Sequence, residues 1–101
     1  MLAKVGSKMF VHIVFMKFRE PSSIMIAKDQ LEKLKETVSC ILELEVGIDI
    51  LHSERSKDLV LITRFENEHE YKRYVVDPNH QTVLKWLKTQ LIESSTVDYI
   101  E

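Results

Sequence analysis

Residues 10–18 read FVHIVFMKF, and this stretch decides the fold. Branched and aromatic residues favour a β-strand, in which alternate side chains point to opposite faces. One face of this strand would carry Val11, Ile13 and Phe15, and the other Phe10, Val14, Met16 and Phe18. Because both faces are apolar, both must be covered. We therefore expect helices on one face and a second copy of the chain on the other.

The rest of the chain supplies helices and further strands around this one. Apolar residues recur at steps of three and four from Ile24 to Ile41, which is typical of an amphipathic helix. We expect Ser22 or Ser23 to cap its start. The remaining pattern predicts strands over 45–52, 59–65 and 96–100, a helix after Asn67 that breaks at Asp77-Pro78-Asn79, and a helix from His80 to Ser94 and Ser95. This order, β-α-β-β-α-β, is the ferredoxin-like α+β arrangement with an antiparallel sheet.

The length of 101 residues allows one domain. Met9 begins the patterned part, so we expect a single domain over residues 9–101. Residues 1–8 contain two lysines and no apolar run typical of a signal peptide. We expect these eight residues to form a poorly ordered N-terminal extension.

Charge and cysteine content narrow the partners and the setting. The 14 basic and 16 acidic residues give a net charge of -2, which favours neither nucleic acid nor a membrane surface as a partner. The longest apolar run is far shorter than the roughly 20 residues of a membrane span. Cys40 is the only cysteine, so a disulfide within the chain and a cysteine-rich metal site are excluded. A lone thiol in an apolar run predicts a buried residue in a cytoplasmic protein.

Four histidines are present, and none shows a metal-binding spacing. We therefore predict no metal site, and we expect His52 and His69 to be solvated. His12 differs because it interrupts the apolar strand. A buried imidazole needs a hydrogen-bond partner. His12 is either a core residue bonded to a backbone carbonyl or a polar member of a site.

Tyr74 and His80 flank the predicted break at residues 75–79. The break would let both side chains turn toward one end of the sheet. Histidine is the usual general base near neutral pH, and a tyrosine hydroxyl can donate to a developing oxyanion. The structural alternative is that Tyr74 packs on the sheet and His80 caps the following helix.

Several stretches together resemble the stress-responsive A/B barrel (Dabb) family. They are the strand with His12, the run Tyr74-Val75-Val76-Asp77-Pro78-Asn79-His80, and Val97-Asp98-Tyr99 near the end. The resemblance implies a ferredoxin-like chain that forms a homodimeric α+β barrel. One family member, a plant polyketide cyclase, works without a cofactor. Its working histidine and tyrosine match His80 and Tyr74, and its strand histidine matches His12.

We therefore expect a small apolar cleft that binds or transforms a small, aromatic or polyketide-like molecule by His/Tyr acid–base chemistry. The candidate catalytic residues are His80, Tyr74 and His12, with no cofactor and no metal. One alternative is a non-catalytic stress-related or ligand-binding protein. Another is a cofactor-free monooxygenase of the dimeric barrel superfamily. A haem-degrading barrel is not supported, because no Asn-Trp-His set is evident and Trp86 is expected to pack.

Overall fold

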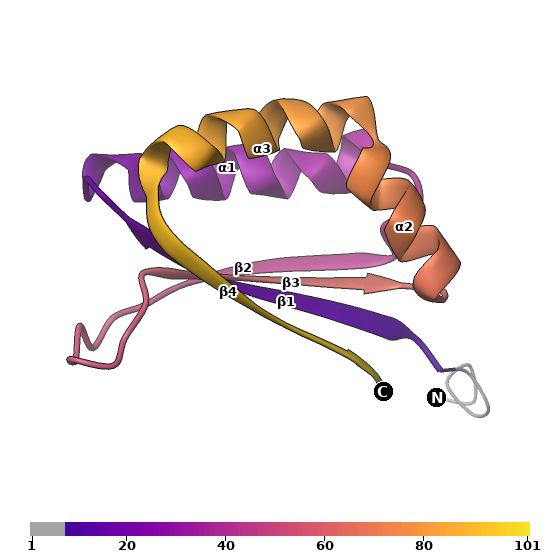
Figure 1. The fold of residues 1–101 in the computed structure, drawn as a ribbon, viewed down its shortest axis with the longest axis horizontal. Coiled ribbons are helices and arrows are strands. Elements are labelled where there is room, and N and C mark those ends of the chain that lie inside the picture. The colour runs from indigo at the N-terminus through magenta and orange to yellow at the C-terminus, as the bar shows by residue number, and fades with distance from the viewer. Residues whose placement is uncertain (1–7) are drawn as a thin grey trace.

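The computed structural model describes residues 8–101, so nearly all of the predicted N-terminal extension, residues 1–7, lies outside the described part. The elements follow the predicted order (Figure 1). They are β1 (Phe10–Phe18), α1 (Ser22–Thr37), β2 (Glu43–Ile48), β3 (Leu59–Phe65), α2 (Glu68–Val76), α3 (Pro78–Gln90) and β4 (Leu91–Ile100). The ferredoxin-like α+β prediction, with its broken second helix, is confirmed.

The four strands form one antiparallel sheet in the order β2-β3-β1-β4. β1 is therefore central, with Phe10 opposite Phe65 of β3 and Ile100 of β4. α1 and α3 lie side by side over one face of the sheet, and α2 turns down toward the sheet at one end (Figure 1). The helices therefore cover one of the two apolar faces of β1.

The core lies between this face and the helices. The predicted stripe of α1 is buried at Ala27, Leu31 and Leu34. Phe65 and Leu61 of β3 are at most 2% exposed and belong to the same core cluster. Trp86 packs partly buried against the same core, as expected, and Cys40, predicted to be buried, is partly buried there. Burial raises the pKa of the Cys40 thiol.

Two predictions about α1 are wrong. The helix ends at Thr37 rather than near Ile41, because Val38 is extended. Val38 and Ile41 are still buried, so the apolar pattern continues beyond the helix as extended chain. Neither Ser22 nor Ser23 is the N-cap: Pro21 occupies that position without a side-chain hydrogen bond. The Ser23 hydroxyl instead donates to the Gln90 side chain at 2.5 Å.

The boundaries of two strands also differ from the prediction. β4 begins at Leu91, so Ser94 and Ser95 lie in the strand and do not end the helix. Residues 91–95 pair with the C-terminal part of β1, where Phe18 lies opposite Leu91 and Phe15 lies opposite Ser95. β4 therefore starts earlier than predicted. β2 spans Glu43–Ile48 and ends well before His52. His52 has a φ of 53°, which a strand cannot contain, and its N–H donates to the Asp49 carboxylate.

Side-chain caps define the two later helices. The Asn67 side chain accepts from the Glu70 N–H at 3.0 Å and caps α2, which begins after Asn67 as predicted. Asp77 caps α3 by accepting from the N–H groups of Asn79 and His80. α3 therefore starts at Pro78 rather than at His80, since proline suits the first turn of a helix.

The second face of the sheet, here called the outer face, is turned away from the helices. Strand alternation places Ile13, Phe15, Val60, Ile62 and Val97 on it. Phe15 and Val97 are 38% and 53% exposed. In the single chain this apolar face is therefore uncovered in part. Within residues 8–101, no helix has the length and apolarity that a membrane span requires.

Candidate functional site

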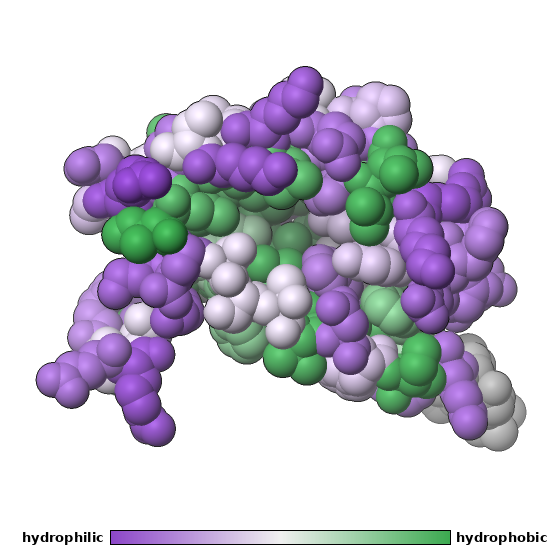
Figure 2. Space-filling view, in the orientation of Figure 1, coloured by the Kyte–Doolittle hydropathy of each residue, from purple (hydrophilic) through white to green (hydrophobic). Residues whose placement is uncertain are grey.

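A cavity of about 260 Å³ lies between the helix-facing side of the sheet and the helices α2 and α3. Figure 2 shows a hollow between the helix layer and β4, with apolar residues gathered inside it. β4 is an edge strand of the sheet, and the hollow in Figure 2 opens beside it. We call this cavity the cleft. Its lining consists of His12, Val14, Met16, Leu61, Tyr71, Tyr74, Val75, His80, Leu84, Leu87, Leu91, Ser94 and Thr96.

β1 presents His12 to the cleft. The residue is 9% exposed, and its strand register places it opposite Thr63 of β3 and Asp98 of β4. Its Nδ1–H donates to Asp98 Oδ1 at 2.5 Å. Because this bond engages Nδ1, the neutral ring keeps its lone pair on Nε2. The pairing of a central and an edge strand thus holds the His12 ring in one orientation.

The first turn of α3 holds His80 on the other side of the cleft. Its Nδ1–H donates to the carbonyl oxygen of Val75 at 3.3 Å. Desolvation by burial lowers the pKa of His80, the Val75 hydrogen bond opposes this, and the nearby His12 lowers the pKa further. The ring is therefore neutral at neutral pH, with the lone pair of Nε2 free to accept a proton.

The two tyrosines come from successive turns of α2. The Tyr74 ring lies against His80, with centroids 4.0 Å apart and planes at 32°. Tyr74 is 2% exposed, and burial raises the pKa of its hydroxyl. Tyr71 stacks on Phe10 and lies 4.8 Å from the His12 ring, and burial raises its pKa also. Both hydroxyls therefore remain protonated donors at neutral pH.

The structure brings the three predicted residues, His12, Tyr74 and His80, to one cavity. His12 is bonded to a side-chain carboxylate rather than to a backbone carbonyl. His80 does not cap α3 through its side chain, because Asp77 does so. His52 and His69 lie outside the cleft with exposed side chains, as expected. The catalytic roles of the three residues stay predictions.

Sequence analysis missed two residues of this site. Asp98 was named only as part of the motif Val97-Asp98-Tyr99, and Tyr71 was not singled out. The strand alternation of Ser94, Thr96 and Asp98 would have placed all three on one face of β4. The spacing of Tyr71 and Tyr74 would have placed both on one side of α2.

The polar groups that line the cleft are imidazoles, phenols and hydroxyls, and none of the lining residues is a lysine or arginine. In the part of the chain that is described, no three His, Cys, Asp or Glu side chains are grouped as metal ligands. The chemistry that these residues can perform themselves is proton transfer and hydrogen-bond donation.

A family model for the stress-responsive A/B barrel domain matches residues 10–101. The chain belongs to this family. The resemblance inferred from the sequence is thereby confirmed, and Asp98, Tyr74 and His80 all fall inside the matched region. No curated protein matches the sequence.

Solved structures share the fold of this A/B barrel chain. A dimeric protein of unknown function from Bacteroides fragilis is 28% identical, with a TM-score of 0.79 over 90% of this chain and 94% of that chain. A dimeric ferredoxin-like protein of unknown function from Thermobifida fusca is 16% identical, with a TM-score of 0.83 over 95% and 93%. A hydroxynitrile lyase from Passiflora edulis is 14% identical, with a TM-score of 0.83 over 94% of each chain. At these last two identities the likeness shows the fold alone.

Proposed function

We propose that this A/B barrel protein binds a small molecule in the cleft and moves protons on it by acid–base chemistry that needs no cofactor. The observation that carries the proposal is the meeting of two oriented imidazoles and a buried phenol around one cavity. Asp98 orients His12, the Val75 carbonyl orients His80, and Tyr74 lies against the His80 ring.

His80 acts as the general base in this proposal. Its lowered pKa keeps it neutral and able to accept a proton at neutral pH. The Tyr74 hydroxyl donates a hydrogen bond to the oxygen that gains negative charge as the proton leaves. A base and an oxyanion donor side by side suit the removal of a proton from a hydroxyl, or from a carbon next to a carbonyl.

His12 supports this pair. The Asp98 carboxylate fixes its tautomer, so that Nε2 can accept a hydrogen bond from the bound molecule or return a proton to it. The role of Asp98 is therefore to position His12 rather than to contact the substrate.

The size of the cleft limits its ligand. A cavity of about 260 Å³ exceeds the roughly 150 Å³ that accommodates benzene in a protein core. A single-ring compound with one or two polar substituents therefore fits. The hydroxynitrile lyase named above shares the fold. Hydroxynitriles with a single ring, which would fit the cleft, are therefore reasonable first substrates to test.

The test measures two reactions with small neutral compounds. One is deuterium exchange at the methyl group of acetophenone in D₂O, followed by NMR, and the other is release of benzaldehyde from mandelonitrile. We expect turnover of at least one compound. His80→Gln should then lower the rate about 100-fold or more, and Tyr74→Phe by a similar factor.

Matched controls come from the surface of the same chain. His69→Gln and Tyr99→Phe change one exposed histidine and one exposed tyrosine, and should leave the rate unchanged. If compounds stabilise the protein against heat but none is turned over, the chain is a ligand-binding protein and the catalytic proposal fails. Oxygen uptake with a quinol would instead favour the monooxygenase alternative.

We also propose that the chain forms a homodimer through the outer face. The Bacteroides fragilis and Thermobifida fusca proteins of the same fold are described as dimeric. Here the partly exposed Phe15 and Val97 lie on the face that a second copy would cover. Burial of this face would remove an apolar patch from water.

A further inference from the structure

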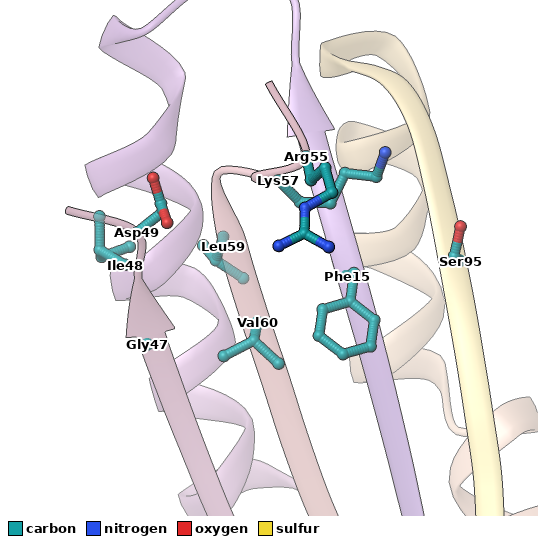
Figure 3. Close-up of a pocket in the computed structure, with 9 residues that line it drawn as sticks. All are labelled: Phe15, Gly47, Ile48, Asp49, Arg55, Lys57, Leu59, Val60 and Ser95. Carbon is teal, nitrogen blue, oxygen red and sulfur yellow. The ribbon is translucent and has the colours of Figure 1, made fainter. Parts of the chain in front are cut away.

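A hollow larger than the cleft, about 480 Å³ in volume, lies on the outer face beside the loop that joins β2 to β3 (Figure 3). Its floor carries Phe15 and Val60, which a second copy would cover in the proposed dimer. This hollow is therefore assigned to the dimer interface. The polar contact that the proposed function leaves without a role lies on the other side of the sheet, between α2 and α3.

The carbonyl oxygen of Val75 lies at the C-terminal end of α2, where helical hydrogen bonds run out. Pro78, three residues later, has no N–H, and the Asn79 N–H, four residues later, donates to the Asp77 carboxylate at 2.8 Å. The backbone donors at these two positions therefore do not bond to the Val75 oxygen. Two side chains of α3 do so instead.

These two side chains converge on the same oxygen. Gln81 Nε2 donates to Val75 O at 2.5 Å, and His80 Nδ1 donates to it at 3.3 Å. A carbonyl oxygen has two lone pairs and can accept both bonds. Because both donors bring positive hydrogen atoms to one oxygen, each bond weakens the other. The shorter bond belongs to Gln81, and the longer one holds the His80 ring.

Gln81 reaches the cleft through this oxygen rather than directly. Val75 and His80 line the cleft, whereas Gln81 is not among the residues that line it. Its side chain is half-buried on the first turns of α3. A bound molecule would therefore touch His80 and not the Gln81 amide.

We propose that Gln81 is a positioning residue for His80. By occupying one lone pair of the Val75 oxygen, it keeps the bond to the His80 ring long, so that the ring is oriented without being held tightly. The Nε2 lone pair is then left to the bound molecule. This inference rests on the proposed role of His80 as the base of the cleft, and it names the group that sets how firmly that base is held.

The protonated form of His80 is the form that Gln81 affects most. An imidazolium gains more from a carbonyl acceptor than a neutral ring does, because the hydrogen bond becomes charge-assisted. A carbonyl that already accepts from Gln81 stabilises the imidazolium less. Gln81 therefore favours the neutral ring, and it acts in the same direction as burial, which lowers the pKa of His80.

The other groups that face His80 come from α2, from β1 and from the junction before α3. The Tyr74 ring of α2 lies against the His80 ring. His12 of β1 lowers the pKa of His80 further, and the Asp77 carboxylate raises it. Substitutions at Gln81 leave these three groups in place. A change in the titration of His80 would therefore report on the shared oxygen.

NMR titration of the histidine ring signals tests the proposal without any substrate. The signal that is absent in His80→Gln belongs to His80. Gln81→Met keeps the length of the side chain and removes the donor, and Gln81→Leu removes the donor with a different shape. We expect both variants to raise the proton affinity of His80 about threefold or more, because the Val75 oxygen then bonds to the ring alone.

Two further variants make the result specific. Gln81→Lys restores a donor within reach of the Val75 oxygen, so the pKa of His80 should be at or below its wild-type value. Gln90→Met is the matched control, because it removes a glutamine of the same helix that also bonds to another element, through the Ser23 hydroxyl. It should leave the titration of His80 unchanged.

Turnover gives a second readout. The pH profile of kcat/KM reports on the base of the free enzyme, so its acid limb should move with the NMR titration. In Gln81→Met, kcat/KM should fall about threefold on the acid limb and change little at about pH 8.

Two outcomes would overturn the proposal. One is a loss of thermal stability in Gln81→Met and Gln81→Leu with an unchanged pKa of His80, which would mean that Gln81 only caps α2. The other is an equal rise of this pKa in Gln81→Lys, which would mean that the donor does not matter. If the pKa rises as expected and no compound is turned over, positioning by Gln81 is supported and the catalytic proposal alone fails.

Discussion

At the scale of single residues, the two histidines of the cleft are held by different acceptors. His12 donates to a carboxylate of the adjacent strand β4, whereas His80 donates to a backbone carbonyl of the preceding helix. The first arrangement depends on the identity of residue 98. The second depends on the break between α2 and α3, which brings Val75 O within reach of the ring. Substitution at Asp98 can therefore release His12 without moving His80.

The lowered pKa of His80 predicts how stability depends on pH. The unfolded chain binds this proton at about pH 6.5, and the folded chain binds it only at lower pH. As the pH falls through the unfolded value, protonation therefore favours the unfolded state, and stability is lost until the folded pKa is reached. Above the unfolded value this loss is absent.

Urea unfolding between about pH 7.5 and pH 5 measures this effect. The wild type should lose more stability on acidification than His80→Gln, which cannot take up the proton. His69→Gln, which removes an exposed histidine, should follow the wild type. Parallel curves for the wild type and His80→Gln would contradict the prediction.

At the scale of elements, the cap of α3 is a structural requirement of the site. Asp77 accepts from the N–H of Asn79 at 2.8 Å and of His80 at 3.4 Å, so it fixes the turn that carries the His80 ring. Asp77→Ala should lower the free energy of unfolding by about 1 kcal/mol, and Asp77→Ser should restore much of it. Urea denaturation measures both.

A comparison with the cap of α2 separates the effect of the Asp77 cap on stability from its effect on the site. Asn67→Ala removes the cap of α2 and serves as the matched comparison, with a similar loss of stability. Only Asp77→Ala should also change the NMR signals of the His80 ring. An unchanged stability in Asp77→Ala would show that the backbone turn needs no side-chain cap.

The bounds of elements with a strong hydrophobic pattern could be predicted from the sequence, whereas the start of the exposed strand β4 could not. β1, β3 and the stripe of α1 follow the period of their structures because one face is buried. β4 is exposed from Ile92 to Ile100, so no apolar alternation marks its start at Leu91. The break between α2 and α3 was predictable because Asp-Pro ends a helix by local chemistry.

The candidate site, too, could be predicted only in part from the sequence. Tyr74 and His80 flank a break that is visible in the sequence, so they could be named. The bond between His12 and Asp98 depends on the register of β1 against β4, which a single sequence does not reveal. Asp98 therefore became evident only when the two strands were placed side by side.

At the scale of the whole molecule, the outer face predicts the assembly. Light scattering should give about 24 kDa, twice the 11.9 kDa of one chain. Val97→Glu places a charge on the outer face and should shift the mass to that of one chain, because an unpaired charge in an interface is costly. Met25→Glu, at an exposed apolar position on α1, is the matched control and should remain dimeric. A wild-type mass near 12 kDa at micromolar concentration would contradict the proposal.

The bond between His12 and Asp98 joins residues 86 positions apart, from the first strand and the last. During synthesis, β1 leaves the ribosome first and waits with one edge unpaired until β4 follows. The nascent chain can therefore form the helix layer and most of the core before it can form the bond between His12 and Asp98. A chain released before residue 98 would keep much of its core while lacking the carboxylate that orients His12. The site is thus complete only after β4 has been synthesised and has paired with β1.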